Sequence, residues 1–291
     1  MNKQPVYYLI CTTPRSGSSH LSDLMYYAGL SGRDNMENLH KSFTERMTLQ
    51  DGAVAEQIKK IFDASSNPQG IGGFKIMHGQ FEFLYHEIIK LNSYRHWQIS
   101  DMAKLFPPQT KYIFLHRRDK VRQAISVLKM TQGLISNLDS NNDPGQNLHF
   151  NLAQIELYRR RLKQGEKAWQ KFFQAAKIEP HEIFYEEYTA DLKKTLMALF
   201  HYLGVALPDP LIVQSRFSRL SNATTEDWLR RYYQAGLIGR NASLAMQVAI
   251  LPILYKLSYY LRRFLPFYTV TLDYIKKKTG TQAKPKVGFK W

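Results

Sequence analysis

The sequence predicts an α/β protein with a central parallel sheet flanked by helices. Short apolar runs follow turn-forming residues, a helical period follows each run, and this alternation recurs along the chain. Ligands of such sheets bind beyond the carboxyl ends of the strands. We therefore expect the binding site to be formed by the turns at 11–19 and 116–119.

The individual elements follow from the same patterns. Strands are expected at residues 6–10, in the run "PQGIGGFKIMHG" ending near Met77-His78, at 111–116, and in "HEIFYEEY". Helices are expected from Ser18 to Gly29, at 54–62, around 81–105, after Asp119 on the face of Val121, Ala124, Ile125 and Leu128, at 152–176, and up to Leu203-Gly204.

Composition limits the function classes and suggests two domains. The chain has 291 residues, 44% of them hydrophobic, which excludes global disorder, and its single cysteine, Cys11, excludes a disulfide framework. The N-terminal apolar run is too short for a signal peptide, so we expect a cytoplasmic protein. We assign a first domain to residues 1–236 and a basic, aromatic-rich, amphipathic extension to 237–291.

The net charge of +16 is concentrated in this extension: residues 240–291 hold ten Lys and Arg against Asp273 alone. No stretch reaches about 18 uncharged apolar residues, so a spanning helix is not expected. Residues 244–290 are predicted either to contact the inner face of an anionic membrane peripherally, or to pack on the domain or form a homo-oligomer.

The stretch "CTTPRSGSSH" joins the first strand to the first helix and has the character of an anion site. Gly17 permits close backbone approach, while Ser16, Ser18 and Ser19 offer hydroxyl donors at a helix N-terminus. The Gly-Lys pair of a nucleoside triphosphate loop is missing, which disfavours ATP with magnesium. A serine-rich helix cap without a ligand is the alternative.

The stretch "FLHRRDKVRQAIS" predicts a second anion site after the third strand. Arg117 and Arg118 follow the strand, and Ser126 lies about two turns into the next helix. Arginine is suited to bidentate phosphate binding. Two separate sites, one per turn, match a nucleotide phosphorylated at its 5′ and 3′ ends; a solvated helix start is the alternative.

Together the stretches "TPRSGSS", "GGFKIMHG", "FLHRRDKVRQAIS", "IFYEEY…YLG" and "SNATTEDWLRRYY" resemble sulfotransferases that use 3′-phosphoadenosine 5′-phosphosulfate (PAPS), and most resemble the bacterial trehalose 2-sulfotransferase family. The resemblance spans roughly residues 5–235. It implies a P-loop-kinase-like fold and metal-free sulfuryl transfer to a hydroxyl of a carbohydrate or glycolipid, with adenosine 3′,5′-bisphosphate as product.

The resemblance also implies roles for individual residues. The 5′-phosphosulfate would be bound by residues 15–19 (Arg15, Ser16, Gly17, Ser18 and Ser19), and the 3′-phosphate by Arg117 or Arg118 with Ser126. Arg15 would counter charge on the bridging oxygen, with Lys75 as helper; a solvated strand-end lysine is the alternative reading.

The acceptor hydroxyl needs a general base. The family places a glutamate four residues after a loop glycine, whereas here Glu37 lies five residues after Gly32. Asp34 and His40 are nearby substitutes, and His78 is a further candidate because other sulfotransferases use histidine. Two rival functions remain: a small-molecule kinase of the same fold, and a non-catalytic basic protein that binds membranes or nucleic acid. We expect no nucleic-acid partner.

Overall fold

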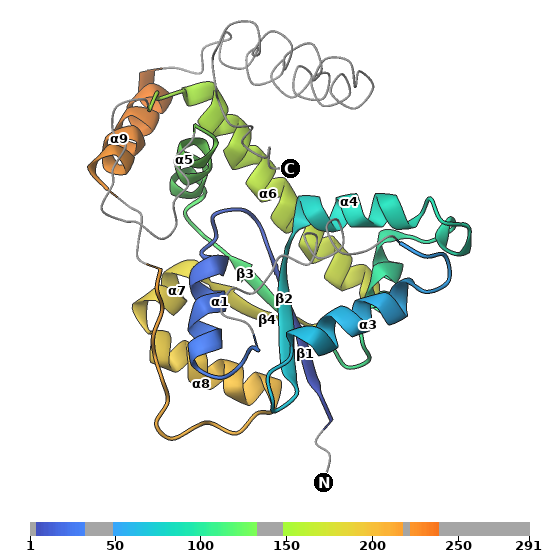
Figure 1. Cartoon of the computed structure of the whole chain (residues 1–291). Helices are drawn as coiled ribbons and strands as arrows, with labels where there is room; N and C mark the ends of the chain where they lie inside the picture. The colour runs from blue at the N-terminus through green and yellow to red at the C-terminus, as the bar shows by residue number, and fades with distance from the viewer. Residues whose placement is uncertain (1–3, 33–48, 133–147, 218–221, 239–291) are drawn as a thin grey trace, which may run out of the picture.

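The computed structural model describes residues 4–32, 49–132, 148–217 and 222–238. Within them, four parallel strands form one sheet in the order β2-β1-β3-β4 (Figure 1). The strands are β1 (Val6–Thr12), β2 (Ile71–Met77), β3 (Lys111–His116) and β4 (His181–Phe184). The predicted α/β class with a central parallel sheet is confirmed.

Helices follow the strands in the expected alternation. They are α1 (Ser18–Tyr27), α3 (Val54–Ser65), α4 (His78–Ile88), α5 (Lys120–Thr131), α6 (Leu152–Ala176), α7 (Tyr185–Ala190), α8 (Leu192–Leu203) and α9 (Ala223–Ile238). Two 3-10 helices, η1 (Asn92–Tyr94) and η2 (Ile99–Leu105), lie between α4 and β3.

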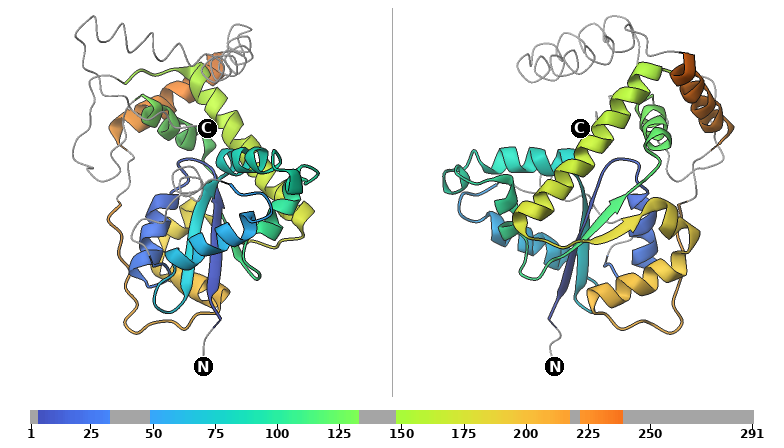
Figure 2. Two further views of the ribbon diagram at one scale, coloured as in Figure 1. Left: turned by 45° about the vertical axis from the view of Figure 1, so that its right-hand side comes forward. Right: turned by 180° about the vertical axis from the view of Figure 1, so that it is seen from behind.

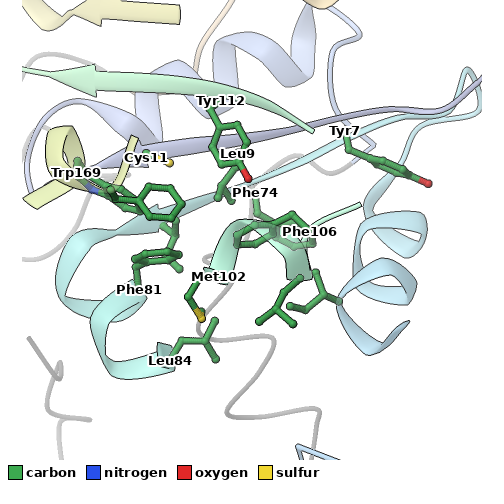
Figure 3. Packing of buried hydrophobic residues seen from close by; sticks show 14 of the residues in the cluster. Tyr7, Leu9, Cys11, Phe74, Phe81, Leu84, Met102, Phe106, Tyr112 and Trp169 are labelled. Carbon is green, nitrogen blue, oxygen red and sulfur yellow. The ribbon is translucent and has the colours of Figure 1, made fainter. Parts of the chain in front are cut away.

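Both faces of the sheet are covered by helices, as the apolar strands predict. Successive side chains of β1 alternate between two cores, because strand side chains point to opposite faces. Tyr7, Leu9 and Cys11 pack with α3, α4 and α6, as Figure 3 shows from close by, whereas Tyr8 and Ile10 pack with α1 and α8. Figure 2 shows the two helical layers from other sides.

A third core lies beyond the sheet, between α5, α6 and α9. Trp228 and Leu229 of α9 are buried there against Ile125 and Leu128 of α5. The hydroxyl of Tyr232 donates to Glu156 of α6 at 2.8 Å. The stretch "SNATTEDWLRRYY" thus includes the first part of α9, which packs against α5 and α6.

Two expectations for the elements were wrong in part. "HEIFYEEY" is a strand only to Phe184, because its partner β3 ends at His116, paired with Phe184; α7 then begins at Tyr185. The continuous helix around 81–105 is instead α4 followed by η1 and η2. The backbone N–H of Gln98 donates to Asp101 at 2.8 Å and starts η2 anew.

The strand order places the site. The chain adds β2 on one side of β1 and then crosses over to add β3 on the other side. Although all the strands stay parallel, the direction in which strands are added to the sheet therefore changes between β1 and β3. Their ends are level, since Thr12 pairs with Leu115. The turns after these two strands therefore lie side by side at the switch point, where α/β sheets bind ligands.

Candidate active site at the ends of β1 and β3

The turn after β1 has a backbone that glycine makes possible. Gly17 caps α1 with φ 91°, and Arg15 also lies in the left-handed region with φ 61°. A Cβ on Gly17 would lie 2.4 Å from the Tyr188 hydroxyl oxygen and 2.6 Å from Cδ2 of Tyr185. Backbone conformation and close packing therefore both require glycine here.

Uncharged side chains hold this turn from beneath. Gln123 of α5 donates to the Pro14 carbonyl at 2.7 Å and to the Thr13 hydroxyl at 3.1 Å. The Trp169 indole donates to the Thr12 carbonyl at 2.8 Å, and the Tyr188 hydroxyl donates to the Gly17 carbonyl at 2.9 Å. The turn is thus fixed before any ligand arrives.

The serines of the turn differ in what they can offer a ligand. Ser16 is buried, with its hydroxyl oxygen 2.5 Å from that of Thr12. Since Thr12 donates to the Leu115 carbonyl at 2.7 Å, Ser16 is the donor of the pair. Its hydroxyl therefore braces the turn. Ser18 is the first residue of α1 and is buried, and Ser19 follows it.

Lys75, near the end of β2, lies where the sequence suggests. It is only 8% exposed, and its Nζ donates to Ser19 Oγ at 3.2 Å. Burial lowers the pKa of Lys75 to about 8. This buried ammonium faces the first turn of α1, so Lys75 is no ordinary solvated strand-end lysine.

The two arginines after β3 have different surroundings. Arg117 is 9% exposed; its guanidinium lies 4.2 Å from the Tyr185 ring centroid, and its Nε has no hydrogen-bond partner among the described residues. The Arg118 side chain is half exposed, lies over the Phe184 ring and pairs with Glu187. Arg117 therefore faces the interior, while Arg118 is satisfied at the surface.

The two turns are in direct contact. Arg15 Nε donates to Ser126 Oγ at 3.0 Å, which joins a residue expected at the 5′ end of a nucleotide to one expected at the 3′ end. Burial, and next the charge of Arg117, lower the pKa of Arg15. Two guanidinium groups of like charge, Arg117 buried and Arg15 partly buried, lie close enough to interact and favour an anion between them.

The candidate bases are only partly within the structure. His78 is the first residue of α4, with its ring 5.8 Å from that of Trp169, and burial lowers its pKa despite nearby Glu82. A Cβ on Gly165 of α6 would lie 3.1 Å from Thr13 and 3.6 Å from His78, so this glycine lets α6 approach both. Glu37, Asp34 and His40 lie outside the described residues.

Sequence reasoning missed the residues that support the two turns. Gln123, Trp169 and Tyr188 are all distant in sequence from the turn after β1 that they support. Gln123 and Tyr188 do lie within stretches that the sequence singled out, but nothing in those stretches marks them as supports. The stretch "IFYEEY" did belong to the family resemblance, but its placement in a strand hid the contacts of α7 with both turns. Had we predicted a helix from Tyr185 onwards, Tyr185 and Tyr188 would have been expected on one face of it, three residues apart.

The extension predicted to contact membranes falls almost entirely at 239–291, outside the described residues. In the ranges that the structure does describe, no helix combines the length and apolarity needed to cross a bilayer. The assignment of residues 237–291 to a separate unit stays a prediction.

Three solved structures resemble the chain weakly. A sulfotransferase from Alicyclobacillus acidocaldarius has 12% identity and a TM-score of 0.40, covering 86% of this chain and 96% of that one. The sulfotransferase domain from the curacin biosynthetic pathway has 16% identity and a TM-score of 0.38, with 77% and 83% covered. The sulfotransferase domain of the Synechococcus PCC 7002 olefin synthase has 17% identity and a TM-score of 0.35, with 88% and 95% covered.

No curated protein sequence matches this chain. The sequence model of one family does match, over residues 7–235, which is most of the chain and includes β1 from its second residue, both turns at the switch point and α9 up to residue 235. The chain therefore belongs to the Stf0 sulphotransferase family.

Proposed function

We propose that this protein transfers the sulfuryl group of PAPS to a hydroxyl of a carbohydrate or glycolipid. Membership of a sulphotransferase family supports sulfuryl transfer in general. The observation that carries the finer proposal is the convergence of two guanidinium groups from adjacent turns, the partly buried Arg15 and the buried Arg117, with Arg117 Nε unpartnered among the described residues. A donor that is anionic at both ends fits this charge.

The residues present fit such a donor. Its 5′-phosphosulfate would be held by the turn at 15–19 together with Lys75, and its 3′-phosphate by Arg117 with Ser126. We assign the 3′-phosphate to Arg117 rather than Arg118, since only Arg117 is directed inward. When bound, the donor supplies an activated sulfuryl group with a phosphate leaving group.

The protein's contribution would be position and charge, as for phosphoryl transfer. Arg15 and Lys75 would stabilise negative charge as the bond from sulfur to the phosphate oxygen breaks. The acceptor hydroxyl would lose its proton to a base, and its oxygen would form the new bond to sulfur as the bisphosphate leaves. Glu37 remains our first choice of base and His78 the second.

A binding measurement tests the donor. Adenosine 3′,5′-bisphosphate should bind at least about tenfold more tightly than AMP, because a charge-assisted contact contributes roughly 1.5–3 kcal/mol. Arg117→Ala should abolish this preference, and Arg118→Ala, its matched control, should keep it. Isothermal titration calorimetry of the wild type and the two variants with each nucleotide measures this preference. Equal affinity for both nucleotides in the wild type would refute the proposal, and tight magnesium-dependent binding of ATP would favour a kinase.

Transfer of labelled sulfuryl groups tests the base and the acceptor. Glu37→Gln should reduce turnover by at least about a hundredfold, in the range of general-base contributions, with nucleotide affinity unchanged. His78→Asn should be nearly as active as wild type if Glu37 is the base; the reverse pattern assigns the role to His78. A free disaccharide and the same sugar on a lipid serve as acceptors. Transfer to neither contradicts the acceptor class.

A further inference from the structure

Helix α7 contacts both turns. Its second residue, Glu186, accepts hydrogen bonds from the backbone of the turn after β3. The backbone N–H of Arg118 donates to Glu186 Oε2 at 3.0 Å, and that of Asp119 donates to Oε1 at 3.1 Å. Both carboxylate oxygens are thus used by consecutive amides. Because α7 also carries Tyr185 and Tyr188, which contact Gly17, the same short helix touches both turns.

Glu186 is held in its charged form. Its burial alone would raise the pKa, but the amides of Arg118 and Asp119 lower it below the usual value for glutamate. Hydrogen bonds to a carboxylate are about twice as strong as those between neutral groups. The ionised carboxylate therefore makes two charge-assisted hydrogen bonds to the backbone of the turn.

The carboxylate acts on Arg117 through the backbone more than by direct pairing. Arg117 Nε lies 3.9 Å from Glu186 Oε1, beyond hydrogen-bond distance, and is without a hydrogen-bond partner in the described part of the chain. At the far end of the turn, Asp119 accepts from the Arg122 N–H at 2.8 Å and caps α5. With its next residues fixed, Arg117 enters the interior and Arg118 goes to the surface.

We propose that Glu186 is a positioning residue of the nucleotide site: its carboxylate holds the 117–119 turn so that Arg117 faces inward, towards Arg15 and its partner Ser126. The inference rests on the proposed function, because it assigns Arg117 to the 3′-phosphate. It adds a residue that touches neither donor nor acceptor.

The next residue supplies a matched control. Glu187 lies on the same helix and carries the same charge, but its side chain is 62% exposed and pairs with the half-exposed guanidinium of Arg118. It accepts no hydrogen bond from the turn backbone among those of the described residues. Glu187→Gln therefore removes a charge near the site and leaves the turn intact.

The hold on the turn is tested without any ligand. Glu186→Gln retains one acceptor oxygen but presents an amide donor to the other N–H. Hydrogen exchange of the Arg118 and Asp119 amides, followed by NMR, should accelerate by about tenfold or more, as expected for loss of a charge-assisted bond. In Glu187→Gln the rates should equal the wild type. Unchanged exchange in Glu186→Gln overturns the inference.

Nucleotide binding then tests the consequence. Removing a negative charge near an anion site should tighten both nucleotides if electrostatics alone operate. Positioning predicts the opposite for one of them: Glu186→Gln should weaken adenosine 3′,5′-bisphosphate about tenfold and spare AMP, raising KM for the donor with kcat unchanged. In the Arg117→Ala background it should cause no further loss. Tighter binding of both nucleotides overturns the inference.

The outcomes separate the inference from the function on which it rests. If wild-type protein does not prefer the bisphosphate but the amides exchange faster in Glu186→Gln, the proposed donor is wrong and the hold of Glu186 on the turn stands. If the preference exists and survives Glu186→Gln, the positioning role is refuted and the donor stands. Should the Gln variant fail to fold, Glu186→Asp undergoes the same measurements, since a side chain one methylene shorter withdraws the carboxylate from the two amides.

Discussion

The turns after β1 and β3 lie side by side, but the protein holds them by different means. The turn after β1 is fixed by neutral donors, namely Gln123, Trp169 and Tyr188, and by a glycine that no other residue can replace. The turn after β3 is fixed by two carboxylates, Glu186 on its amides and Asp119 at the start of α5. One turn depends on shape, and the other on charge.

The cations at the two turns also differ, in how their charge responds to pH. Lys75 faces the first turn and titrates near neutral pH, since burial lowers its pKa to about 8. Arg117 belongs to the second turn, and a guanidinium stays charged throughout the working range. Steric changes should therefore damage the first turn most, and a rise of pH above 7 should weaken anion binding at the first turn while the charges of the second stay unchanged.

The largest effect is expected at Gly17. Gly17→Ala adds a methyl group 2.4 Å from the Tyr188 hydroxyl at a residue with φ 91°. Strain and overpacking together should reduce the free energy of unfolding by about 2–4 kcal/mol. Because the turn must shift, affinity for AMP and for the bisphosphate should fall together, by about tenfold or more. Calorimetry and titration measure the two effects.

Gly204 is the matched control. It has a similar left-handed backbone, with φ 70°, caps α8 away from the site, and has no atom within 4 Å of an added Cβ. Gly204→Ala should cost only about 1 kcal/mol, the strain alone, with nucleotide affinity unchanged. If Gly17→Ala behaves like Gly204→Ala in both measurements, shape does not govern the first turn.

Much of the fold followed from local sequence. The spans of β3 and α6 match their expected limits, and Gly204 ends α8, because apolar periodicity and glycine caps are local signals. The end of β4 was misjudged since the length of its partner strand decides it. Tyr and Phe favour strands, but beyond Phe184 the ladder has no partner and Tyr188 is buried in a helix instead.

The sequence predicts candidate site residues but not how they contact one another. Local patterns propose Arg15, Gly17 and Ser126, and only the fold shows that Arg15 bonds to Ser126. Sequence spacing could not distinguish Arg117 from Arg118, because their different exposure depends on aromatic rings and a carboxylate that other elements bring to them. Ser16 was expected to face a ligand, but burial against Thr12 turns its hydroxyl inward.

The smallest effect separates the two turns by pH. Lys75 in the folded protein loses its proton as pH rises through about 8. An anion binds best to the protonated lysine, and the AMP phosphate is fully charged only above its own second pKa of about 6. AMP affinity should therefore be highest near pH 7 and fall by about tenfold between pH 7 and 9. Arg117 keeps its charge over this range. The ratio of bisphosphate to AMP affinity should therefore stay constant while both affinities decline.

Lys75→Met completes the comparison. It should bind both nucleotides weakly and without the decline above pH 8. It should also unfold at higher temperature at pH 7, because a charge that burial disfavours is gone. That gain should shrink from pH 8 towards 10.5, where the unfolded wild type still binds a proton that the folded protein has lost, so that wild-type stability rises. A declining affinity ratio in the wild type would place the titrating cation at the second turn and reverse the assignment of the two.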